Sequence, residues 1–336
     1  MLREMNLGTR AWLRLGVLLS AGALAAGCSR EPAPAAAPAA PAAGANAAAA
    51  GAALPGAAAA TVAAASVSPD QAMAGVDAAP LLKALFGDYG TAKDGGVVAT
   101  LNDPDQPGVQ GLYLLSRVAS TVLPGGETVL VFNGEACDEA GEAQTAHATP
   151  GLLSIFVLKR EDAAGQGQGA WRVLRRHENF AALGSFGNVG TLSWVALAPG
   201  KVGLAAEHGG TWQGYTSMFL SLFDVGSPQP RDLMGEEQQV LADTEGACGG
   251  RVAECWFVRA NWRVLPPAAG APYGELVMDF DGEQRVATAA SLAAAEANAD
   301  DDNVVRTSKR VAGSARYVFD GKAYKLASGA NPIPTF

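Results

Sequence analysis

The side chains that could perform acid–base, nucleophilic or metal chemistry are few and scattered. The three histidines, His147, His177 and His208, do not lie at the short spacings of a zinc-binding motif. The chain contains no Gly-x-Ser-x-Gly nucleophile elbow and no glycine-rich phosphate loop. The sequence therefore predicts no metal, no cofactor and no catalytic residue, and it favours a binding protein over an enzyme.

Acidic side chains are the remaining source of reactive groups. A hydrolase would need two carboxylates with separated pKa values in one cleft, and Glu207 and Asp224 are candidates for this alternative function. The acidic segments 102–105 and 298–303 lack the central glycine and distal glutamate of a calcium-binding loop. We expect both segments to be solvated turns.

Three cysteines lie beyond the N-terminal region. Cys248 and Cys255 flank the segment 249–251, whose two glycines can turn the chain, so we predict a disulfide between them. Closing a loop of this size contributes about 2.5 kcal/mol in the chain-entropy model. Cys137 then remains as a lone buried thiol.

A more specific candidate site follows from the geometry of one hairpin. Residues 191–198 and 201–207 are predicted strands joined by a turn at Pro199-Gly200. The glycine-rich segments 179–190 and 208–215 flank this hairpin, so both must lie at the same end of it. Aromatic residues with polar neighbours are common anchors of recognition surfaces. The candidate binding residues are Phe186, Asn188, His208, Trp212, Gln213 and Tyr215. In the competing interpretation, Trp212 and Tyr215 fold inward and cover the edge of the sheet.

The elements that would position these residues are mostly strands. From residue 97 onward, short segments rich in Val, Leu, Phe, Trp and Tyr are separated by turn residues. Predicted turns include Asp281-Gly282 and Asp320-Gly321, because Asp-Gly favours the positive φ angles of a tight hairpin. Strand–helix–strand alternation is absent from the pattern, so the sequence predicts an all-β antiparallel meander, propeller-like or forming a barrel or sandwich. Helical segments are expected at 79–86 and, less regularly, at 289–299.

The N-terminus has the features of an export signal. Arg3, Arg10 and Arg14 precede an uncharged apolar run at 15–26, which is shorter than the roughly 20 residues needed to span a bilayer. The run leads into Leu-Ala-Ala-Gly-Cys at 24–28. This motif resembles the lipobox of bacterial lipoprotein precursors, although Ala25 stands where that family usually has leucine. The resemblance implies a signal peptide at 1–27 and lipidation of Cys28, and Ser29 after it favours the outer membrane.

A long uncharged linker follows. Between residues 32 and 69 the chain is mostly alanine, proline and glycine, which offer too little apolar surface to offset the entropy lost on ordering. We therefore expect 28–69 to be a disordered tether, spanning about 35 Å, between the lipidated Cys28 and a periplasmic β-rich domain at 70–336.

Charge and architecture together restrict the function. The chain has a net charge of −9, and residues 1–27 carry +2, so the processed protein is near −11 and is not expected to bind nucleic acid. We expect a lipid-anchored protein on the periplasmic face of the outer membrane that binds a protein or a cell-wall glycan. In its anchor, linker and β-rich domain it is similar to lipoproteins that inhibit cell-wall hydrolases, some of which have propeller-like domains. The first alternative is a structural or assembly factor of the outer membrane.

Overall fold

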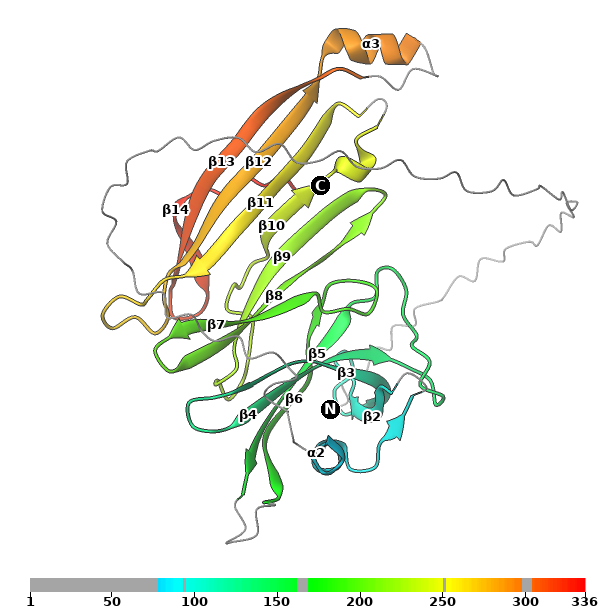
Figure 1. Cartoon of the computed structure of the whole chain (residues 1–336), viewed down its shortest axis with the longest axis vertical. Helices are drawn as coiled ribbons and strands as arrows, with labels where there is room; N and C mark the ends of the chain where they lie inside the picture. Colours follow the sequence, from blue (N-terminus) through cyan, green and yellow to red (C-terminus); the bar gives the residue numbers. More distant parts are fainter. Residues whose placement is uncertain (1–77, 93–94, 162–168, 250–251, 298–303, 336) are drawn as a thin grey trace, which may run out of the picture. The chain divides into compact units, whose positions relative to one another are not determined.

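The computed structural model of the chain describes residues 78–335 except 93–94, 162–168, 250–251 and 298–303. The predicted signal peptide, Cys28, the linker and the acidic segment 298–303 lie outside the described residues. Strands dominate the described part, which confirms the predicted all-β fold (Figure 1). In chain order the elements are α2 (Ala78–Phe86), β1 (Gly90–Thr91), β2 (Val97–Asn102), β3 (Gln110–Val122), β4 (Thr128–Ala136), β5 (Gly151–Arg160), β6 (Trp171–Leu183), β7 (Thr191–Ala198), β8 (Lys201–Trp212), β9 (Tyr215–Asp224), β10 (Gln238–Asp243), the 3-10 helix η1 (Glu245–Ala247), β11 (Glu254–Val264), β12 (Leu276–Ala287), α3 (Ala289–Ala297), β13 (Arg306–Phe319) and β14 (Tyr324–Gly329).

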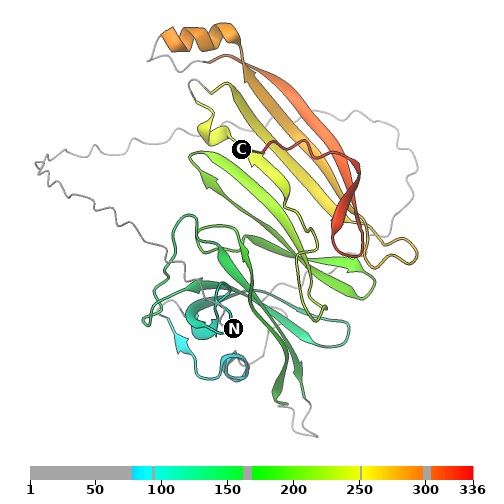
Figure 2. The same ribbon diagram turned by 180° about the vertical axis from the view of Figure 1, so that it is seen from behind.

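The strands form two sheets in which each strand pairs with its neighbours in sequence. One sheet has six strands in the order β1 to β6, and the other has eight strands in the order β14 to β7 (Figures 1 and 2). Every pairing between the named strands is antiparallel, so the predicted meander is confirmed. The described strands are gathered in these two sheets and not in four-stranded propeller blades.

The six-stranded sheet is built around β4 and β5, which are buried on both faces. Their nearly continuous apolar sequences fit this position, since a strand covered on both faces does not alternate with polar residues. On one face α2 packs Leu81 and Leu85 against the sheet. There the rings of Phe86, Phe132 and Phe156 meet edge to face, with centroids 5.3–5.7 Å apart.

The other face of β4 and β5 belongs to a core that contains residues of both sheets. Ile155 and Val157 from β5 share this cluster with Leu204 from β8 and Phe223 from β9. All four side chains are almost completely buried. A single apolar core therefore joins the two sheets at β8 and β9.

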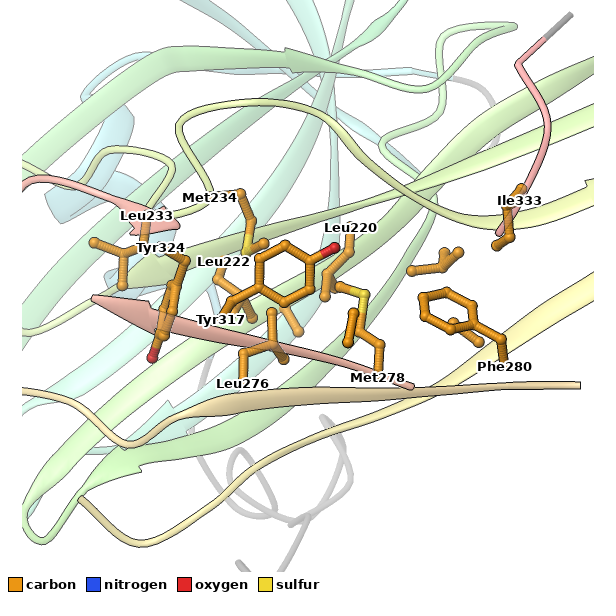
Figure 3. Packing of buried hydrophobic residues seen from close by; sticks show 14 of the residues in the cluster. Leu220, Leu222, Leu233, Met234, Leu276, Met278, Phe280, Tyr317, Tyr324 and Ile333 are labelled. Atoms are coloured by element: carbon orange, nitrogen blue, oxygen red, sulfur yellow. The ribbon is translucent and has the colours of Figure 1, made fainter. Parts of the chain in front are cut away.

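The eight-stranded sheet has its own core on the opposite face of β8 and β9 (Figure 3). Leu220 and Leu222 from β9 lie in this cluster with Met278 from β12 and Tyr317 from β13. The sheet changes register at a β-bulge in β10, between Gln239 and Leu241.

The longest pairing of the sheet corrects one predicted turn. β12 continues straight through Asp281-Gly282 and pairs with β13 from Leu276 to Ala287. A Cβ on Gly282 would lie 2.0 Å from the carbonyl oxygen of Phe257, so this glycine allows close approach of β11 and does not turn the chain. The predicted turns at Pro199-Gly200 and Asp320-Gly321 do connect β7 to β8 and β13 to β14.

The outer strand β14 covers only part of β13. Its partners are residues 315–319 of β13, and no strand among the described residues pairs with 306–314 on that side. The uncovered part carries Arg306, Lys309 and Arg310 and no acidic residue. Arg310 forms an exposed ion pair with Asp281 of β12 at 2.8 Å.

Candidate binding surface

The structure corrects the extent of the two predicted glycine-rich loops. β6 continues to Leu183 and β8 to Trp212, so that only 184–190 and the turn at 213–214 lie outside strands. Gly209 does not end β8, because a Cβ there would lie 1.9 Å from the carbonyl oxygen of Ser217 on β9. Gly209 therefore allows β8 and β9 to pair closely and does not form part of an open loop.

The turn between β8 and β9 holds two exposed aromatic side chains in fixed positions. Trp212 and Tyr215 are the last Cα pair of the hairpin, and the hydroxyls of Thr211 and Thr216 lie 2.7 Å apart beside them. Gln213 and Gly214 between them have φ angles of 50° and 84°. Two positive φ angles in a two-residue turn are typical of a type I′ hairpin, whose twist matches that of the strands.

Phe186 is held in a conformation that bulky residues seldom adopt. Its φ angle is 52°, which costs of the order of 1–3 kcal/mol, and its side chain is 53% exposed. The ring lies against the imidazole of His147 with centroids 4.8 Å apart. The backbone is fixed by hydrogen bonds from the Phe186 amide to the His147 carbonyl (3.2 Å) and from the Gly187 amide to the Thr149 carbonyl (2.8 Å). The exposed ring is therefore positioned by contacts from a distant segment.

The loop 184–190 and the hairpin are in direct contact. The Ser185 hydroxyl donates a hydrogen bond of 2.9 Å to the Gly209 carbonyl. A Cβ on Gly210 would lie 2.4 Å from the Trp212 indole and 2.7 Å from the Ser185 hydroxyl oxygen, so the indole lies across Gly210 and beside Ser185. We call the continuous surface formed by His147, Phe186, Trp212 and Tyr215 the aromatic end.

Five of the six candidate residues are exposed at this surface. Trp212 is 45% and Tyr215 37% exposed, and Asn188 and Gln213 are exposed as well. The Asn188 side-chain carbonyl accepts the Gly190 amide at 2.8 Å, which fixes the end of the loop. His147 also belongs to this surface, and no sequence pattern indicated it.

His208 is the exception, because its side chain is buried. Its Nε2 lies 3.0 Å from the Ser221 hydroxyl, which donates its own hydrogen bond to Asp232. Burial lowers the pKa of His208, and the carboxylates of Asp232 and Glu237 oppose that shift. In a Ser-His-Asp triad the histidine lies between the serine and the aspartate and accepts the serine proton. Here Ser221 lies between His208 and Asp232 and donates its proton to the carboxylate, so this chain of hydrogen bonds is not a triad. The buried His208 side chain therefore connects β8 to Ser221 of β9 and does not form part of the exposed surface.

The two carboxylates proposed for a hydrolase do not share a cleft. Glu207 accepts a hydrogen bond from Trp262 Nε1 at 2.8 Å, and Asp224 accepts one from the Tyr273 hydroxyl at 2.8 Å. Asp224 pairs with Gly203 on β8. Gly203 and Glu207 are four residues apart on this strand, so the two carboxylates are separated by about 13 Å along it. Burial, followed by the hydrogen bond to Asp224, raises the pKa of Tyr273 to about 12. Both carboxylates therefore have structural partners of their own.

The aromatic end rests on η1, which directly precedes the disulfide-closed loop 248–255. Cys248 and Cys255 are joined, with Cα atoms 5.6 Å apart, which confirms the predicted pairing. A Cβ on Gly214 at the hairpin tip would lie 2.3 Å from the Gly246 carbonyl carbon, so the tip lies directly on η1. The Thr244 hydroxyl accepts the Trp256 amide at 2.8 Å and holds the start of η1 on β11.

The other reactive groups are not part of the aromatic end. Cys137 is a half-buried free thiol, and burial together with Asp138 raises its pKa. A groove of about 450 Å³ is lined by Leu123, Lys201 and Asp224, at the end of β8 opposite to Trp212. In the part of the chain that the structure describes, no three His, Cys, Asp or Glu side chains are grouped to hold a metal ion. Neither described α-helix has the length and apolar character needed to cross a bilayer.

Comparison with known proteins adds no family. No protein-family model matches the chain, and no curated protein or solved structure matches it.

Proposed function

We propose that this chain is a lipid-anchored periplasmic lipoprotein that binds a protein or a cell-wall glycan through the aromatic end. The observation that carries the proposal is that Phe186, Trp212 and Tyr215 are each more than a third exposed although each is fixed by its backbone and its neighbours. Exposed aromatic side chains with few rotatable bonds give contact area at low cost in conformational entropy. Anchors of this kind dominate the energetics of recognition surfaces.

The composition around these rings supports the same function. Residues 184–190 and 209–215 contain mainly glycine, serine, threonine, asparagine and glutamine beside the aromatic residues. Small polar residues next to tyrosine and tryptophan are also typical of the binding loops of antibodies. The strain at Phe186 supports a binding role as well, since unfavourable backbone conformations tend to be kept at functional sites.

The binding role is tested by capture from a cell-envelope extract with the full chain in a non-ionic detergent. Trp212→Ala and Phe186→Ala will each lower recovery of the specific partner by at least tenfold. Phe257→Ala is the matched control, because Phe257 is a similarly exposed aromatic residue (41%) on β11 that is not part of the aromatic end. Equal recovery by the wild type and the Trp212→Ala variant, with both folded, would refute the proposed site.

The anchor is tested separately. Cys28→Ala will abolish labelling by radioactive palmitate and move the protein from the membrane fraction to the soluble periplasmic fraction. Membrane retention of the unlabelled variant would contradict lipid anchoring without affecting the binding site.

The narrower form of the proposal is an inhibitor of a cell-wall hydrolase. In that form the purified protein slows the clearing of a cell-wall suspension by the hydrolase, and Trp212→Ala removes the inhibition. Unchanged clearing at a large excess of the protein excludes this form but leaves other partners open to the capture experiment.

A further inference from the structure

The charges around the aromatic end are predominantly negative. The segments that form this end or directly adjoin it are 133–149, 184–190, 205–218 and 237–248, and none of them contains a lysine or an arginine. We call their carboxylates the acidic rim: Glu135, Asp138, Glu139, Glu142, Glu207, Glu237, Asp243 and Glu245. Arg259 of β11 and Arg285 of β12 form ion pairs with Glu207 and Glu245, so the eight carboxylates of the rim outnumber these two cations by six.

Several contacts place the acidic rim next to the aromatic residues. A Cβ on Gly187 would lie 2.2 Å from the carboxylate of Glu135, so this carboxylate lies beside the loop that carries Phe186. The Glu237 carboxylate is close enough to His208 to oppose the lowering of the pKa of this histidine by burial. Glu245 begins η1, on which the hairpin tip rests.

The acidic rim does not simply reflect the overall composition. β13, in the same eight-stranded sheet, carries Arg306, Lys309, Arg310 and Arg316 and no acidic residue. Arg263 of β11 and Arg316 of β13 form ion pairs with Asp279 and Glu275 on exposed side chains. Charge is thus mixed along the long strands and predominantly negative at the aromatic end.

We propose that the partner of the aromatic end is a protein surface on which an apolar patch is surrounded by lysine and arginine side chains. This inference rests on the proposed function and specifies its partner. An apolar centre with a charged rim is the usual arrangement of a protein interface, and opposite charge on the two rims selects the partner and speeds association. A neutral glycan has no charge for the acidic rim to select.

The test uses three labelled peptides with the same Leu-Trp-Leu centre, flanked on each side by two lysines, two serines or two glutamates. Binding to the full chain in a non-ionic detergent is measured by fluorescence anisotropy. At about 50 mM salt the lysine peptide is expected to bind at least about tenfold more tightly than the glutamate peptide. At about 500 mM salt this ratio should shrink to about two or less, because the Debye length falls to a few ångströms.

Two double variants with the same change in charge locate the effect. Glu139→Gln with Glu237→Gln neutralises part of the acidic rim and should reduce the lysine-to-glutamate ratio at least threefold while leaving the serine peptide unchanged. Asp88→Asn with Glu296→Gln is the control, because these exposed carboxylates lie after α2 and on α3. An equal ratio in the two double variants overturns the proposed partner.

The outcomes separate this inference from the proposed function. If Trp212→Ala leaves the affinity for all three peptides unchanged, the aromatic end is not the binding site and the proposed function fails. If Trp212→Ala weakens all three but the flanking charge has no effect, the binding site stands and the cationic partner is wrong. The cationic partner is also wrong if a neutral N-acetylglucosamine oligomer binds more tightly than the lysine peptide. Absence of binding by all three peptides at millimolar concentration overturns the cationic partner, whereas the proposed function is decided by the capture experiment.

Discussion

Removal of the disulfide between Cys248 and Cys255 tests how much this cross-link, which directly follows η1 under the hairpin tip, contributes to the free energy of unfolding. The two cysteines are seven residues apart, so the cross-link closes a loop of about eight residues. The chain-entropy model gives a contribution of about 2.5 kcal/mol for such a loop at 25 °C. The Cys248→Ser variant is therefore expected to unfold with a free energy lower by about 2.5 kcal/mol.

The loss should not be much larger, because other contacts keep the segment in place. The Thr244 amide donates to the Trp256 carbonyl at 2.8 Å, the Trp256 amide donates back to the Thr244 hydroxyl, and Arg285 forms an ion pair with Glu245. These contacts do not depend on the cross-link. For a domain of this size, the expected shift in the melting temperature is about 5–10 °C.

The assay is guanidinium unfolding of the wild type and of Cys248→Ser, followed by circular dichroism at pH 7. The wild type in the presence of dithiothreitol should match the variant, since reduction removes the same cross-link. Cys137→Ser is the control, because Cys137 is a free thiol outside the closed loop. A loss below about 1 kcal/mol, or no effect of dithiothreitol on the transition, would refute the loop-entropy reasoning.

Three further predictions concern the core, the hairpin and the buried histidine. Phe156→Ala will lower the free energy of unfolding by about 3–5 kcal/mol in denaturant titrations, because a fully buried ring between two others is lost. Phe156→Leu will lower the free energy of unfolding by less than Phe156→Ala does. Gly210→Ala will displace the Trp212 indole that lies across Gly210 and will lower the free energy of unfolding by about 1–3 kcal/mol. It will also shift tryptophan fluorescence emission to longer wavelength, and unchanged emission would contradict the packing of the indole on Gly210. Burial lowers the pKa of His208 below its value in the unfolded chain, so the unfolded state takes up a proton first as the pH falls. The contribution of neutral His208 to the free energy of unfolding is therefore fully present above about pH 6.5 and is lost as the pH falls below that value. The decrease in unfolding free energy between pH 7 and pH 5 will therefore be smaller in His208→Gln, and an identical decrease would exclude His208 as its source.

Features that depend on adjacent residues could be predicted from the sequence. The disulfide between Cys248 and Cys255, the turn at Pro199-Gly200 and the helix ending at Phe86 are each set by side chains within one short segment. The strand-rich pattern likewise predicted an antiparallel meander, because hairpins join strands that are neighbours in sequence.

Features that depend on distant contacts could not be predicted. Asp281-Gly282 has the sequence of a turn, yet Gly282 lies within β12 because the β11 backbone passes close to it. His147 lies in a region without a strong pattern and reaches the aromatic end only through its contact with Phe186, 39 residues away in the chain. The burial of His208 depends on Ser221 and Asp232, which the hairpin geometry alone does not locate.

The part of β13 that β14 leaves uncovered has a consequence for self-association. An uncovered strand offers unpaired backbone groups to another chain, which is a common start of aggregation. Two copies meeting at residues 306–314 would bring Arg306, Lys309 and Arg310 of one strand against the same cations of the other. Like charges facing each other across a strand pair are destabilising. Repulsion between these cations is therefore expected to oppose pairing of two copies of the protein through β13.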